Sequence, residues 1–185
     1  MAQRIGKYKL TKRDSELSLA DGGHIGGTLS VGGAATFQST LSGNRTLVES
    51  VTADDTLTAA ESGKIFVFAD AAAVLTLPDS GGGDIIGCTF KFISNFQGTG
   101  QEVICSDTSN EVMLGGVVHV DTDDDTVTKG FAAEVADGFS SIEITGTTEG
   151  EPGSLFTITN IAADRWIVEG VMQSAGSSAS PFAAS

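Results

Sequence analysis

Residues 140–172 read SSIEITGTTEGEPGSLFTITNIAADRWIVEGVM, and this stretch decides the fold class. In SIEIT (141–145), and again at Phe156 and Ile158, apolar and polar residues alternate, which gives a strand one apolar face. The run GEPG (150–153) has the composition of a turn. The stretch therefore predicts three short β-strands, at 140–146, 154–161 and 165–172.

The same pattern of short apolar runs extends over residues 51–173, with turn signals such as PDSGGG (78–83) between the runs. Short strands at roughly ten-residue spacing, with no helix-length periodic segment between them, are typical of a sandwich or barrel. We therefore predict an all-β domain, either a β-sandwich or barrel-like, with the ten Phe residues and Trp166 supplying much of its core. The further strands are expected at 56–59, 64–69, 73–77, 85–93, 102–106, 111–120 and 126–133.

A Gly-rich segment precedes this domain: residues 21–44 read DGGHIGGTLSVGGAATFQSTLSGN. Between its glycine pairs, apolar and polar residues alternate in strands too short to bury an apolar face alone. Copies of the segment from other chains would complete such a core, as neighbouring units do in repeat proteins. We predict that residues 21–50 form a trimerisation segment; a Gly-rich linker is the alternative. The side chains expected to meet on a three-fold axis are Leu29, Val31, Phe37 and Leu41.

Charge is divided unevenly along the 185 residues, which carry a net charge of −14. Five of the ten Lys and Arg residues lie in the first 13 positions, which contain no acid. The remaining residues carry five cations against 24 acids, a net charge of −19. An acidic body makes nucleic acid an unlikely partner, because phosphate binding needs clustered cations. A basic arm over residues 1–20 suits a tether to an acidic surface, with a solvated terminus as the alternative.

The remaining segments carry weaker signals. The apolar runs are only a few residues long, whereas a membrane-spanning helix needs about 20, so no membrane contact is expected. The basic start does not lead into an apolar segment of the secretory type. Residues 174–185 are small and polar, and we expect a tail that is mobile or that orders against a neighbour.

Asp121, Asp123 and Asp125 have the spacing of the first three oxygen ligands of a calcium loop. Thr126 stands where that loop needs Gly, and Ala132 where it needs Glu. A hairpin turn is therefore the preferred interpretation. The three aspartates are only weak candidates for a metal site, and neither a metal nor a cofactor is predicted.

Two cysteines, Cys88 and Cys105, belong to no C-x-x-C pair, and His24 and His119 lie far from them in the sequence. A zinc site needs about four such ligands at tight spacing, so we predict buried free thiols, with a disulfide left open. The chain contains no G-x-S-x-G nucleophile motif, and neither histidine has a Ser or Cys motif around it. We therefore expect no enzymatic activity.

Several stretches resemble structural proteins of tailed bacteriophages. RIGKYKLTKRDSELSLADGG (4–23) resembles the opening of such proteins, and GGTLSVGGAATFQSTLSG (26–43) is similar to the Gly-punctuated repeats of phage fibres and trimeric virion proteins. SGKIFV (62–67) and RWIVEG (165–170) resemble a β-domain that recurs among them. The resemblance implies a virion structural role without catalysis, commonly as a homotrimer.

Two versions of that role are open. In the first, the protein is a capsid decoration, or cement, protein on the capsid exterior, and its arm binds the major capsid protein. In the second, it belongs to a tail or head fibre, and its β-domain binds a host surface receptor or glycan. The short length favours decoration, because a fibre shaft usually has more repeats. The capsid contacts expected in the arm are the cations Arg4, Lys7, Lys9, Lys12 and Arg13 and the apolar anchors Tyr8, Leu10, Leu17 and Leu19.

Overall fold

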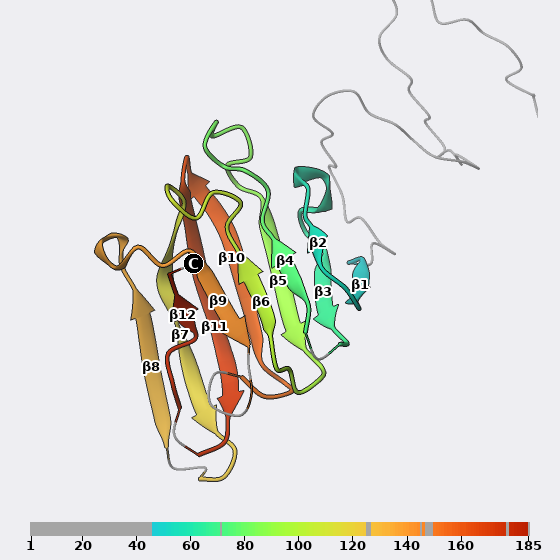
Figure 1. Cartoon of the computed structure of the whole chain (residues 1–185), viewed down its shortest axis with the longest axis vertical. Coiled ribbons are helices and arrows are strands. Elements are labelled where there is room, and N and C mark those ends of the chain that lie inside the picture. The colour runs from blue at the N-terminus through green and yellow to red at the C-terminus, as the bar shows by residue number, and fades with distance from the viewer. Residues whose placement is uncertain are drawn as a thin grey trace, which may run out of the picture. The chain divides into compact units, whose positions relative to one another are not determined.

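The computed structural model describes residues 46–70, 72–124, 127–144, 146, 150–176 and 178–184 (Figure 1). The arm over residues 1–20 and the apolar positions of the Gly-rich segment lie outside these residues. The expected capsid contacts outside them are Arg4, Lys7, Tyr8, Lys9, Leu10, Lys12, Arg13, Leu17 and Leu19, and the expected trimer contacts are Leu29, Val31, Phe37 and Leu41.

The described residues form two mixed β-sheets, so the all-β prediction is confirmed. In spatial order, the seven-stranded sheet contains β1 (Val48–Val51), β3 (Ile65–Phe68), β5 (Thr89–Ser94), β10 (Leu155–Ala162), β11 (Arg165–Ser174), β7 (Val112–Asp121) and β8 (Thr128–Ala133). The five-stranded sheet contains β12 (Phe182–Ala183), β9 (Ser141–Ile144), β6 (Gln101–Ile104), β4 (Val74–Thr76) and β2 (Asp55–Thr56). Two single-turn 3-10 helices, η1 (Ala59–Glu61) and η2 (Val135–Asp137), lie in the connections.

The core lies between the two sheets, which overlie one another in Figure 1. Alternation along β3, β5 and β10 sends their aromatic residues inward, where Phe92 stacks on Phe66 and on Phe156 at centroid distances of 5.7 and 5.2 Å. Aliphatic side chains such as Ile142 and Ile144 face them from the five-stranded sheet. Because aromatic rings bury the largest areas, this cluster supplies a large share of the hydrophobic stabilisation.

Two strands lie outside the expected limits of the domain. β1 begins at Val48, within the segment assigned to the Gly-rich repeat, and pairs in parallel with β3. β12 lies in the expected tail: Phe182 is buried, pairs with Ile142 and stacks on Phe139. The alternation of apolar and polar residues hardly indicates either strand, because only Val51 of β1 is fully buried and β12 is two residues long.

Gly115 in β7 occupies a position that no other residue can fill without strain. Its φ is +103°, and a Cβ there would lie 2.3 Å from the carbonyl oxygen of Val168 in β11. We expect Gly115→Ala to lower the free energy of unfolding by about 2–4 kcal/mol, through backbone strain and overpacking together. Urea unfolding measures this change.

Gly138 is the matched control, because it also has a positive φ, +65°, but has open space around it. Gly138→Ala therefore isolates the cost of backbone conformation, about 1 kcal/mol. Equal unfolding midpoints for the two variants would show that the close approach of β7 and β11 at Gly115 is unimportant.

Candidate functional site

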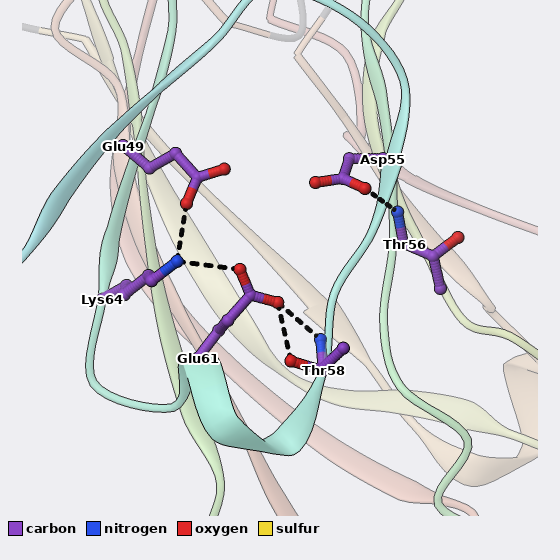
Figure 2. Close-up of polar contacts among 6 residues, drawn as sticks. All are labelled: Glu49, Asp55, Thr56, Thr58, Glu61 and Lys64. Atoms are coloured by element: carbon purple, nitrogen blue, oxygen red, sulfur yellow. Dashed lines mark hydrogen bonds and ion pairs between the residues drawn. The ribbon is translucent and has the colours of Figure 1, made fainter.

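A polar cluster fastens the first described strand to its neighbours (Figure 2). Lys64, just before β3, donates from Nζ to Glu49 of β1 at 2.7 Å and to Glu61 of η1 at 2.8 Å. The second oxygen of Glu61 accepts from the backbone N–H and the hydroxyl of Thr58, both at 2.8 Å, which caps η1. The cluster thus connects β1, η1 and the start of β3 through side chains.

The charges in this cluster stabilise one another. The hydrogen bond from Lys64 lowers the pKa of Glu61 against the opposing effect of burial, and the hydrogen bond to Glu49, followed by that to Glu61, raises the pKa of Lys64. The ion pairs are partly open to solvent, which weakens them. Because each carboxylate already accepts from Lys64, we interpret the cluster as a structural fastening and not as a ligand site.

A buried carboxylate, Glu111, joins two loops to β11. One of its oxygens accepts from the backbone N–H of Ser80 at 2.7 Å and from the Ser80 hydroxyl, and the indole N–H of Trp166 lies 3.4 Å away. The other accepts from the Ser106 hydroxyl and from the backbone N–H of Asp107, both at 2.9 Å. Glu111 is completely buried.

Two opposing effects set the pKa of Glu111. Burial is the largest and favours the neutral acid, but the hydrogen bonds from Asp107, Ser80 and Ser106 together outweigh it, so the pKa lies below its ordinary value. The group therefore stays ionised inside the protein. Its hydrogen-bond donors are all groups of the protein itself, so we interpret the Glu111 carboxylate as a structural group.

The aspartates at 121–125 lie at the turn between β7 and β8, which pair antiparallel. One oxygen of Asp121 accepts from the backbone N–H groups of Asp123, at 2.8 Å, and Asp124, at 3.2 Å, as in a side-chain-stabilised turn. Asp125 lies outside the described residues. Within the part of the chain that the structure describes, no three His, Cys, Asp or Glu side chains are grouped to hold a metal ion.

The two cysteines differ in burial. Cys88 and Cys105 are both free thiols, but only Cys105 is fully buried, whereas Cys88 is partly exposed, so the prediction of buried thiols is confirmed for Cys105 alone. Burial raises the pKa of Cys105 well above the ordinary range. A thiol held protonated is a poor nucleophile. His119 is buried in β7 and packs edge-on against Phe131, with ring centroids 4.7 Å apart.

The described residues leave one face of the seven-stranded sheet uncovered, its outer face. We use "outer face" for the side of this sheet that points away from the five-stranded sheet. Its exposed apolar side chains include Val171, Val118 and Ile167, at 50%, 40% and 39% exposure. The aliphatic residues on it include Val48, Ile65, Val67, Ile93, Val112, Leu114, Val118, Val120, Leu155, Ile161, Ile167 and Val171.

The two outward sides of the sandwich differ in charge. On the five-stranded sheet, Glu102 and Glu143 stand opposite one another in neighbouring strands and alternate with buried residues. On the outer face of the seven-stranded sheet, a shallow hollow over Thr157 of β10 is flanked by Lys91 and Glu169. One side is therefore acidic, and the other is mainly apolar, with the opposite charges of Lys91 and Glu169 near its centre.

Comparisons with protein-family models, with curated proteins and with solved structures give no match. Among the described residues, no helix is long and apolar enough to cross a membrane. The function is therefore inferred from the protein's own charge distribution and surfaces.

Proposed function

We propose that this protein is a non-enzymatic structural protein of a bacteriophage virion, a capsid decoration (cement) protein on the capsid exterior. The observation that carries the proposal is the division of charge: five cations and no acid in the first 13 residues, against a net charge of −19 in the rest. The basic arm of such a molecule is attracted to acidic surfaces, whereas its acidic body is repelled by them.

The partner of the arm is the major capsid protein. Arg4, Lys7, Lys9, Lys12 and Arg13 pair with carboxylates on the shell, and each exposed pair is worth only about 0–1 kcal/mol. Apolar contacts must therefore supply part of the affinity. These come from the anchors Tyr8, Leu10, Leu17 and Leu19.

Self-association multiplies this weak attachment. In a homotrimer held by Leu29, Val31, Phe37 and Leu41, three arms act on the shell together. Once the first arm binds, the others bind at a high effective concentration, so the overall affinity exceeds that of one arm by about 10²–10⁴-fold. The β-sandwich remains outside the shell as a folded body.

Deletion of residues 2–13 tests the attachment. We expect the truncated chain to lose incorporation into particles by at least tenfold, because it lacks five cations and two of the apolar anchors. Its urea unfolding midpoint should stay unchanged, since no described residue is removed. Co-sedimentation with capsids that lack the protein, followed by gel densitometry, measures incorporation.

A second variant separates the effect of the charges from the effect of shortening the chain. In it, the five arm cations are replaced by glutamine, and the length of the chain is unchanged. We expect it to bind more weakly than the wild type, with a reduced salt dependence. Wild-type incorporation of the 2–13 deletion would overturn the proposal.

A fibre component that binds a host surface receptor or glycan is the second candidate, favoured by the Gly-punctuated repeat in residues 21–44. Copy number per particle separates the two. Hundreds of copies support decoration of the capsid, whereas a few tens or fewer support a tail or head fibre.

A further inference from the structure

The outer face of the seven-stranded sheet is depleted of charge in a strongly acidic body. Residues 46–185 contain four Lys and Arg against 21 Asp and Glu. Between the ends of the described strands, this face bears Lys91 and Glu169 as its charged side chains, with Arg165 at one end. Depletion of charge marks the centre of protein interfaces. A face with no net negative charge is also the one on which two acidic copies can meet.

The arrangement of charges on this face is self-complementary. β10 is the central strand of the seven, and Thr157 pairs with Lys91 of β5 on one side and with Glu169 of β11 on the other. At about 4.8 Å between strands, the two opposite charges lie about 10 Å apart across the midline of the sheet. A rotation axis parallel to β10 therefore brings the Lys91 side of one copy to the Glu169 side of another.

The two flanks differ in shape in one row of the face. Ile65, two strands from β10 on the Lys91 side, lies in the same row as Gly116, two strands from β10 on the Glu169 side. In the next row, the equivalent positions are Val67 and Val118, which are both branched. Ile65 of one copy can therefore lie over Gly116 of the next, with Val67 against Val118.

We infer that this outer face is a self-association surface, on which copies of the chain pack around a three-fold axis parallel to β10, with Lys91 of each copy next to Glu169 of its neighbour. The number of copies rests on the proposed homotrimer. The surface adds a contact made by the folded body to the one expected from residues 21–50. A closed ring of three uses both flanks of every copy and leaves no flank free.

The size of the face sets what it can contribute. The seven strands give it a width of about 30 Å, and strands of about six residues give it a height of about 20 Å. Such a face covers on the order of 600 Å², and a ring of three divides it between two contacts, about 300 Å² per partner in each. This is less than the approximately 800 Å² of a standard interface, so the sheet contact acts together with the one expected from residues 21–50. Monomeric proteins rarely leave apolar patches of more than a few hundred Å² exposed.

Charge reversal in the full chain tests the pairing. Sedimentation velocity of the wild type should show trimers at micromolar concentration. Lys91→Glu and Glu169→Lys each place like charges at every contact, and each should raise the concentration for half-dissociation at least tenfold. The double variant restores the opposite charges and should return to within about threefold of the wild type.

Glu143→Lys is the control, because it makes the same charge change as Glu169→Lys on the acidic side of the body. It should sediment as the wild type does. A monomeric wild type, single reversals without effect, or a double variant weaker than both singles would each overturn the inference.

A chemical cross-link reports the sheet contact even where residues 21–50 hold the chains together. In a Cys88→Ser background, chains with Lys91→Cys are co-expressed with chains with Glu169→Cys, so that no chain carries both new cysteines. The mixed oligomers are treated with a bismaleimide spanning about 10 Å, the usual spacing of packed sheets. We expect a covalent dimer on a denaturing gel. Each variant expressed alone should stay uncrosslinked, and a mixture without covalent dimers would contradict the contact.

The two proposals can fail separately. If the 2–13 deletion incorporates normally while the charge swap behaves as expected, the capsid role fails and the self-association surface stands. If the arm is required but the body variants neither dissociate nor cross-link, the surface fails and the decoration role stands.

Discussion

Replacement of Trp166 by alanine is expected to lower the free energy of unfolding by about 3–5 kcal/mol, the usual cost of deleting a buried aromatic side chain. Trp166 is completely buried, packs against Phe90 at a centroid distance of 6.2 Å, and points its indole N–H towards Glu111. The change removes the largest core side chain and leaves a cavity beside a buried carboxylate. Domains of this size are typically stable by only about 5–15 kcal/mol, so the loss is a large fraction of the total.

Urea unfolding followed by far-UV circular dichroism measures this loss, since Trp166 is the only tryptophan and its fluorescence disappears with the change. Trp166→Phe keeps an aromatic ring but loses the N–H, and should cost about 1–2 kcal/mol. Ile167→Ala, on the partly exposed outer face, provides the neighbouring control and should cost less than Trp166→Ala. A loss below 1 kcal/mol for Trp166→Ala would contradict the packing described.

Replacement of Glu111 by glutamine is expected to cost about 1–3 kcal/mol at pH 7, the usual cost of leaving a buried hydrogen-bonding group unsatisfied. The carboxylate accepts from backbone N–H groups on both sides, those of Ser80 and Asp107. The amide of glutamine offers one oxygen and one NH₂ group, so one of these N–H groups would face a donor. Urea unfolding measures the loss, and Glu102→Gln on the acidic side is the surface control.

The same residue makes stability depend on pH. Because the pKa of Glu111 is lower in the folded protein than its ordinary value, its ionisation contributes stability above the unfolded-state pKa of about 4.3. That contribution is lost as the pH falls through the folded-state pKa. The difference in stability between the wild type and Glu111→Gln should therefore narrow from pH 7 to pH 3. A constant difference over that range would show that ionisation of Glu111 does not stabilise the fold.

Periodicity located most of the strands because half-buried strands alternate. Phe90 and Phe92 are completely buried and Lys91 lies between them on the opposite face, in agreement with the pattern TFKF at 89–92. The expected strand 85–93 began too early, since the apolar pair Ile85 and Ile86 lies in a turn. Apolar composition indicated a strand there, while the glycines at 81–83 and 87 favour the turn that forms.

The buried carboxylate gave no sequence signal at all. Glu111 is one of 24 acids, and Asp and Glu are almost never fully buried unless they are paired. Its partners come from three separate places in the chain, at Ser80, Ser106–Asp107 and Trp166. Only the convergence of these segments creates the site.

The sequence by itself determined the all-β class and the division of charge between the arm and the body, because alternation and charge are local properties of the chain. The tertiary structure decided the strand order, including the parallel pairing of β11 with β7 and the central place of β10. That order sets Lys91 and Glu169 on either side of Thr157. Local periodicity cannot specify the strand order, since every strand with one apolar face shows the same pattern. Which strands become neighbours is decided only when all the apolar faces are buried together.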